Sequence, residues 1–169
     1  LAHAGAKVIF SQTMIPAKDK KIPIVIKNTF NPEHPGSRIS ASIKKKEKKE
    51  LGITSLSEIS LFRLKGPAIT SINGINSRIF SILSNKKINL KMVSQPFGEY
   101  STSIAVNQNL LDKTISAIES EFESEFEKGF LDTIHVEKNL TMVSIVGEGM
   151  HSIPGIYGKI FRRLGVEKI

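Results

Sequence analysis

The chain has 169 residues, of which 40% are hydrophobic and 24% are charged, and it contains no cysteine. This length and composition fit one ordinary or two small globular domains, and no apolar stretch approaches the ~20 residues that span a bilayer. The lack of cysteine excludes disulfides and thiolate metal sites, and the first seven residues have no signal-peptide pattern, so we expect a cytoplasmic protein without membrane contact.

The net charge of +8 raises nucleic acid as a possible partner. Its distribution argues against one. Residues 38–50 hold six basic and two acidic side chains, which is half of the net excess, whereas residues 110–128 hold six acidic and two basic ones. Because the basic residues gather in one short polar connection, we favour a solvated loop. Nucleic-acid binding through Lys44–Lys49 remains an alternative hypothesis.

Residues 1–21 are expected to be helical or irregular, with Pro16 near the start of a short polar helix. Residues 22–29 are rich in β-branched side chains and predict a strand, at whose beginning Pro23 is tolerated. The Pro and Gly content of residues 31–36 predicts a turn, after which the lysine-rich connection follows.

From Ile59 the pattern becomes regular. A strand over 59–64 leads into a Gly/Pro/Ser/Thr-rich loop over 66–74, and apolar residues at helical spacing predict a helix over 74–86. In the next strand Ile88, Leu90 and Met92 alternate with Asn89, Lys91 and Val93. A turn at 96–99 and a strand over 102–106 follow.

A second helix is predicted from the apolar spacing between Leu111 and Phe126, with Asn109 as its N-cap and Gly129 ending it at C′. A fourth strand over 133–137 completes the order β-α-β-β-α-β, the split ferredoxin-like unit. A further strand is expected over 140–146.

Residues 66–88 are repeated at 147–169, with an offset of 81 residues and no gap. Such a match indicates duplication. By this alignment the chain stops where the second strand of the second unit is expected to begin. The matching pairs are Gly66/Gly147, Ile72/Ile153, Gly74/Gly155, Ile75/Ile156, Ile79/Ile160, Phe80/Phe161, Leu83/Leu164, Lys87/Lys168 and Ile88/Ile169.

The repeated feature is a strand, a glycine-bearing loop and a helix. Glycine lets a backbone approach a ligand closely, and the N-terminus of a helix favours an anion such as the carboxylate of a free amino acid. Asn89 and Gln95 could supply amide oxygens for the ammonium group. A strand–glycine–helix junction is also a common structural turn, so the pattern alone leaves both interpretations open. The four histidines do not cluster at metal-ligand spacing, and no metal site is expected.

The segments 5–9 (GAKVI), 22–24 (IPI) and 27–36 (KNTFNPEHPG) resemble the junction between the catalytic and regulatory parts of aspartate kinases. Residues 143–150, with Pro154–Gly155 and Ile160–Phe161, resemble the second ACT module of that family. The resemblance spans essentially the whole chain and is closest to the branch that includes fused aspartate kinase–homoserine dehydrogenases. It implies an α+β fold, in which a ferredoxin-like βαββαβ ACT module is joined to a truncated second one.

The same resemblance assigns residues 1–21 to the tail of a kinase domain and 51–138 to a first ACT domain. Residues 22–50, a strand and the basic connection, and residues 139–169 are assigned to the second ACT domain. The family pairs as a homodimer through ACT domains and binds feedback lysine or threonine at that interface. Kinase chemistry needs phosphate-binding backbone, a lysine and metal ligands, which the family places before Leu1. No catalytic residue or cofactor is therefore expected here, while ATP and Mg²⁺ are expected for the parent kinase domain.

Effector-site residues follow from the same resemblance. The family often has glycine where Ser71 stands and proline where Asn73 stands, and both departures could weaken the pocket, which leaves a dimerisation-only module as an alternative. Lys91 stands where lysine-sensing sites tend to be acidic and would repel a lysine side chain, which favours threonine. The positions are Ile69, Ser71, Ile72, Asn73, Gly74, Asn89, Leu90 and Gln95 in the first module, and Gly149, Met150, Ser152, Pro154 and Gly155 in the second.

Overall fold

The computed structural model describes residues 8–41, 51–96, 100–147 and 150–169. The chain divides into a central unit, residues 56–142, and a second unit made of residues 1–55 and 143–169. Residues 42–50, which hold all the lysines of the basic connection, most of the turn predicted at 96–99 and Gly149 lie outside the described residues. None of the helices in the described ranges combines the length and apolar character needed to cross a bilayer.

A four-stranded sheet forms the central unit, and its strands lie in the order β4-β5-β3-β6. Its middle strand β5 runs antiparallel to both neighbours, β3 and β4. With the helices inserted in chain order, this is the predicted ferredoxin-like arrangement. The strands are β3 (Leu51–Lys65), β4 (Leu90–Ser94), β5 (Ser101–Asn107) and β6 (His135–Gly147), and the helices are α2 (Ala68–Ser71), α3 (Ile75–Asn85), the 3-10 turn η3 (Gln108–Leu110), α4 (Leu111–Glu121) and α5 (Glu123–Glu127).

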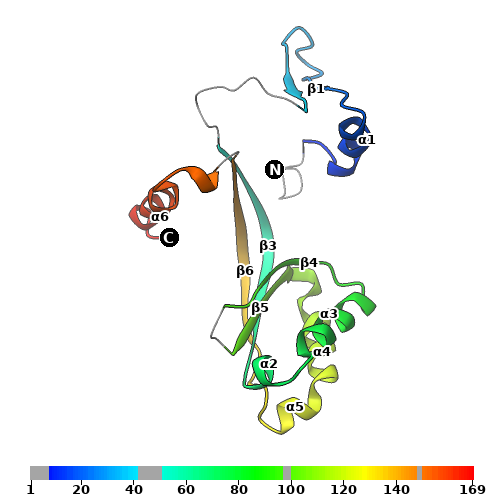
Figure 1. Ribbon diagram of the computed structural model, residues 1–169, viewed down its shortest axis with the longest axis vertical. Coiled ribbons are helices and arrows are strands. Elements are labelled where there is room, and N and C mark those ends of the chain that lie inside the picture. The colour runs from blue at the N-terminus through cyan, green and yellow to red at the C-terminus, as the bar shows by residue number, and fades with distance from the viewer. Residues whose placement is uncertain (1–7, 42–50, 97–99, 148–149) are drawn as a thin grey trace. The chain divides into compact units, whose positions relative to one another are not determined.

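The helices α3 and α4 pack against each other over the sheet (Figure 1). The helix α3 buries Ile75, Ile79 and Leu83, which lie at the predicted helical spacing. Every fully buried apolar side chain among the described residues falls between Ile59 and Leu131, so the core belongs to the central unit. Burying each large apolar side chain contributes about 1.5–3 kcal/mol.

The segment before the basic connection is a small hairpin. The predicted strand 22–29 contracts to β1 (Ile24–Ile26), which pairs antiparallel with β2 (Ser37–Ile39), a strand that the sequence did not predict. Pro23 has no N–H to donate to a ladder, and a turn begins at Asn28, so only three residues remain for pairing. Before the hairpin lie the 3-10 turn η2 (Ser11–Thr13) and the predicted short helix α1 (Met14–Asp19), with Pro16 in its first turn.

The 81-residue repeat is confirmed in the backbone. The helix α6 (Ile156–Val166) has the same length and aligned limits as α3, and the 3-10 turn η4 (Met150–Ser152) precedes it as α2 precedes α3. Gly74 and Gly155 begin the two helices with φ of 82° and 73°.

The two helices also end alike. Lys87 and Lys168 adopt φ of 56° and 60° just past the helix. The next residue donates its N–H back to the fifth residue before it, from Ile88 to Leu83 at 2.9 Å and from Ile169 to Leu164 at 3.0 Å. These are Schellman caps, and they use lysine where glycine is usual.

Three predicted details of the sheet were wrong. A bulge at Lys91 shifts the register of β4, so that Met92 lies opposite Ala105 and Val93 opposite Ile104. Residues opposite each other share a face, so Val93, not Met92, lies on the core side. The strand predicted over 59–64 is longer and begins at Leu51. The strands predicted over 133–137 and 140–146 form one strand, β6, which passes through Asn139 at φ 60°.

The predicted second helix is interrupted and starts differently. Phe122, at φ −113° and ψ 21°, separates α4 from α5. Asn109 is not an N-cap because it lies inside η3, and Leu110 occupies the cap position of α4. Gly129 does end α5 at C′ with φ 70°, as predicted, and Phe130 donates its N–H to the carbonyl of Glu125 at 2.8 Å.

Candidate functional site

The loop between β3 and α3 contains a short helix that the sequence did not predict. This helix, α2, is anchored by the buried side chain of Ile69. Ser71 donates its hydroxyl proton to the carbonyl of Pro67 at 2.6 Å. With its proton donated, the hydroxyl oxygen of Ser71 can only accept further hydrogen bonds, which suits a ligand that donates them. Ile72 then leaves the helix in an extended conformation and packs partly against the core.

Gly74 occupies the N-cap position of α3. Its φ of 82° lies in the left-handed region, and a Cβ placed there would meet no atom within 4 Å. The first helical backbone bond runs from the N–H of Arg78 to the carbonyl of Gly74 at 3.0 Å. Because glycine has no side chain to accept the free N–H groups of the first turn, this end of α3 suits an anion.

The end of β4 lies beside the start of α3. Asn76 donates its side-chain N–H to Oε1 of Gln95 at 3.0 Å. This contact brings one predicted site residue next to the glycine loop. Sequence reasoning missed Asn76, although its place two residues after Gly74 puts an amide in the first helical turn.

The other first-module positions are not all brought to this start. Asn73 is exposed and directly precedes Gly74. Asn89 is also exposed, but it lies just before β4, after the C-terminal end of α3 and at the opposite end of the strand from Gln95. Leu90, at the beginning of β4, is partly buried and packs against the core, so it offers no polar side-chain contact.

A shallow groove of about 320 Å³ runs along the solvent side of α3, beginning at the loop. It joins the predicted positions Asn73 and Gly74 to the end of α4 at Glu121. The lining residues are Asn73, Gly74, Ser77, Arg78, Ser81, Ile82, Asn85 and Glu121.

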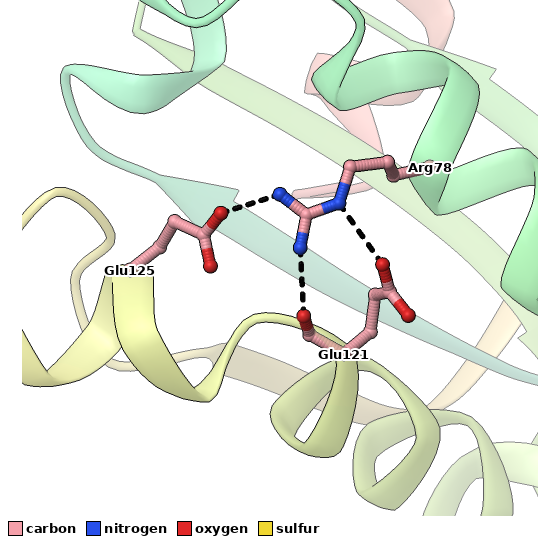
Figure 2. Close-up of polar contacts among 3 residues, drawn as sticks. All are labelled: Arg78, Glu121 and Glu125. Atoms are coloured by element: carbon pink, nitrogen blue, oxygen red, sulfur yellow. Dashed lines mark hydrogen bonds and ion pairs between the residues drawn. The ribbon is translucent and has the colours of Figure 1, made fainter.

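Arg78 closes this groove by joining α3 to the interrupted helix (Figure 2). Its Nε lies 2.9 Å from Oε1 of Glu121, its second nitrogen donates to the backbone carbonyl of Glu121 at 2.8 Å, and its third contacts the carboxylate of Glu125. Glu121 is the last residue of α4, so the guanidinium that donates to its carbonyl acts as a side-chain cap for that helix end.

These contacts shift two ionisation equilibria. The hydrogen bond that Arg78 donates to Glu125, followed by the one to Glu121, raises the pKa of Arg78. The hydrogen bond from Arg78 lowers the pKa of Glu125, against the opposing effect of burial. Both groups are therefore held in their charged forms.

In the second module only part of the predicted loop can be placed. Met150 and Ser152 lie in η4, Pro154 is exposed, and Gly155 begins α6 as Gly74 begins α3. Lys159 stands where α3 has Arg78, so the repeat does not carry the same guanidinium.

A polar pocket of about 570 Å³ lies elsewhere in the central unit, where β5 leads into η3. Gln108 lines this pocket and forms two hydrogen bonds with Asn139. It donates to Oδ1 of Asn139 at 2.9 Å and accepts the N–H of Asn139 at 2.8 Å. The pocket was not predicted from the sequence. Its lining residues are Leu56, Ser57, Glu58, Asn107, Gln108, Asn109, Leu111, Asp112 and Lys138.

Comparisons with known proteins agree with this fold. Residues 63–122 match the model of an ACT domain. The whole chain aligns at 36% identity with 21% of a bifunctional aspartokinase/homoserine dehydrogenase of Haemophilus influenzae. It also superimposes completely on 38% of the aspartate kinase of Clostridium acetobutylicum, with a TM-score of 0.86 and 29% identity. The chain therefore contains an ACT domain and is similar over its whole length to the regulatory region of aspartate kinases.

The aspartate kinase family includes proteins with and without a dehydrogenase. An aspartokinase of Helicobacter pylori aligns with the whole chain at 29% identity, and the chain covers 42% of it. The chain spans about a fifth of the length of the bifunctional relatives that it matches. The loop before α3, Asn76 and Gln95 all lie within the residues of this chain that match the ACT domain.

Proposed function

We propose that this chain senses a free amino acid and feeds its concentration back onto an aspartate kinase of which it is part. The parent enzyme would phosphorylate aspartate in the cytoplasm with ATP and Mg²⁺ bound in its kinase domain. The observation that supports this proposal is the open N-terminus of α3 at Gly74, with Asn76 and Gln95 beside it.

The binding mode follows from the polarity of the loop. The ligand carboxylate binds the free N–H groups of the first turn of α3, where the helix dipole is also favourable. The ligand ammonium donates to Oε1 of Gln95 and to the hydroxyl oxygen of Ser71, which retains acceptor capacity.

Threonine is the effector that we propose. Lys91 lies at the bulge of β4, the strand that ends at Gln95, and its ammonium group would repel the charged side chain of lysine. A threonine side chain carries no charge and avoids that repulsion.

Regulation requires the effector to bind two states of the enzyme with different affinities. We propose that two chains pair through their ACT domains and that the effector stabilises one arrangement of the pair. The kinase domain is less active in that arrangement.

The test is calorimetric titration of the full-length protein with threonine and with lysine. We expect threonine to bind, and Asn76→Ala to weaken its binding about tenfold through loss of a polar contact near a charged ligand. Asn109→Ala is the matched control, because Asn109 is an exposed amide in η3, away from the loop. If neither amino acid binds or inhibits, the sensing proposal is wrong.

One observation supports a second candidate, a module that only dimerises. The hydroxyl of Ser71 is already bonded to Pro67, and Asn73 stands where the family often has proline. This candidate predicts a stable dimer at micromolar concentration that is indifferent to every amino acid. Sedimentation with and without threonine separates the two candidates.

A further inference from the structure

The turn between β1 and β2 is held by its own hydrogen bonds. Asn28 accepts the N–H of Phe30 on its Oδ1 at 2.9 Å, and its carbonyl accepts the N–H of Asn31 at 3.1 Å. The carbonyl of Asn31 then accepts the N–H of His34 at 3.3 Å. Asparagine side chains that bond the backbone two residues on are typical of tight turns.

Two more contacts close the same turn. The ammonium of Lys27 donates to the carbonyl of Pro32 at 2.9 Å, and the N–H of Gly36 donates to Nδ1 of His34 at 3.1 Å. Gly36 has φ 75°, and a Cβ there would lie 2.3 Å from the carbonyl oxygen of Ile26, so only glycine fits. We call residues 27–36 the junction loop. Its conformation is specified locally and does not depend on a hydrophobic core.

The junction loop presents an aromatic side chain to solvent. Phe30 is 97% exposed, whereas Phe62 and Phe122 of the core are fully buried. Single exposed apolar residues are common and need no explanation. Phe30 differs because the loop around it is already ordered, so that burying its ring costs little further conformational entropy. Preordered aromatic side chains are the usual anchors of protein interfaces.

We propose that Phe30 inserts into an apolar pocket on the kinase domain of the same polypeptide, so that the junction loop fastens the regulatory region to the catalytic one. The inference rests on the proposed function and on the family resemblance that assigns residues 1–21 to the tail of a kinase domain. Only residues 22–29 then separate Phe30 from that domain, and so short a tether gives an effective concentration in the millimolar range. Tethering favours the kinase domain over a second copy as the partner.

Photocrosslinking in the full-length protein tests the contact. We would replace Phe30 with p-benzoylphenylalanine, irradiate the protein and map the adducts by mass spectrometry. The expected adducts join position 30 to residues before Leu1 on the same polypeptide. The same crosslinker at Glu33, an exposed position of the junction loop, is the control and should give at least tenfold less of that product.

Adducts confined to residues 56–169, adducts to a second copy, or no adduct at all would each overturn the proposal. The outcome is independent of the effector. Threonine binding without the kinase-domain adduct contradicts the Phe30 contact alone, and the adduct without any response to an amino acid contradicts the sensing function alone.

Hydrogen exchange supplies a second readout. Phe30→Ser should raise amide exchange at least tenfold in the kinase-domain peptides that carry the adduct, and Phe30→Leu should restore most of the protection because it keeps an apolar anchor. Since Phe30 is exposed, neither change should disturb the hairpin itself. Unchanged exchange in Phe30→Ser would contradict the proposed contact.

Discussion

The guanidinium carbon of Arg78 lies 4.4 Å from the centroid of the Phe122 ring, at the residue where the predicted long helix is interrupted. A cation over an aromatic face is attracted by the ring quadrupole. Here the same guanidinium also bonds Glu121 and Glu125 on either side of the interruption. Arg78 therefore links the helix that begins at the glycine loop to both halves of the helix opposite.

Replacing Glu125 with Gln should destabilise the protein by about 0.5–1 kcal/mol at pH 7, because the pair is partly exposed and solvent screens it. The sign of the pH dependence follows from the lowered pKa of Glu125. Its stabilisation is fully present above the ordinary value of 4.5 and is lost as pH falls through the lower folded value. Urea unfolding followed by circular dichroism at pH 7 and in acid should show the difference between wild type and Glu125→Gln shrinking in acid.

A double-mutant cycle of Arg78→Met and Glu125→Gln isolates the pair. At pH 7 the double variant should lose less stability than the two single variants lose together, because the contact is already lost in each single variant. Lys113→Met, which removes a contact with the carbonyl of Lys86, serves as a cation control and should not couple to Glu125. A coupling energy of zero between Arg78 and Glu125 would mean that the observed contact contributes no stability.

Asn73→Pro should stabilise the protein by about 0.5 kcal/mol, because proline reduces the conformational freedom of the unfolded chain. The residue before it has a compatible conformation. Ile72, the preceding residue, is extended at φ −97° and ψ 114°, as a residue before proline must be. Pro154 occupies the aligned position of the second loop, whose glycine has nearly the same conformation. A lower urea midpoint for this variant would show that the two loops differ.

Two glycines with positive φ should respond differently to alanine. At Gly74 the added Cβ meets open space, so only the left-handed backbone is penalised, by about 1–2 kcal/mol. At Gly66 the Cβ would lie 2.5 Å from the carbonyl oxygen of Phe130 and 2.8 Å from Cα of Leu131, and a steric cost is added. We expect Gly66→Ala to be clearly the more destabilising of the two in the same urea experiment. Equal costs would show that the contact with residues 130–131 relaxes freely.

The two hydrogen bonds between Gln108 and Asn139 can be tested separately by substitution. Gln108→Glu keeps an acceptor for the N–H of Asn139 but cannot donate to Oδ1, whereas Gln108→Ala loses both bonds. Each bond contributes about 0.5–1 kcal/mol at this exposed site. Amide exchange at Asn139 should therefore be slowest in wild type, faster in Gln108→Glu and fastest in Gln108→Ala. The exposed Asn109→Ala is a control and should leave that exchange unchanged.

The fold could be predicted because its signals are local and repeated. Helical spacing of Ile75, Ile79 and Leu83 predicts a buried face, and these side chains are indeed buried. The duplication is confirmed down to the φ angles of paired glycines and lysines. Gly129 ends its helix as predicted because its left-handed conformation is a property of the residue itself.

The errors arose where tertiary contacts override local preference. The bulge at Lys91 depends on how β4 aligns with β5, and no pattern within β4 encodes it. The interruption at Phe122 coincides with contacts from Arg78, which is 44 positions away in the sequence. Asn109 is a good cap residue by type, but η3 places Leu110 at the cap.

The candidate site was less accessible to sequence reasoning than the fold. The glycine loop and Gln95 could be named, but the contact that joins them runs through Asn76, which no motif singled out. Side-chain partners across elements depend on the packing of α3 against β4. Spacing along the chain does not contain that information.

Because residues 66–88 match residues 147–169, this polypeptide contains two copies of one loop and helix that can be compared directly. The backbone is nearly the same where the two aligned helices begin and end, while side chains have diverged, as in Arg78 against Lys159 and Asn73 against Pro154. Exchanging such residues between the copies tests one chemical group in two related settings. Duplication has thus placed paired natural variants of one loop and helix within a single molecule.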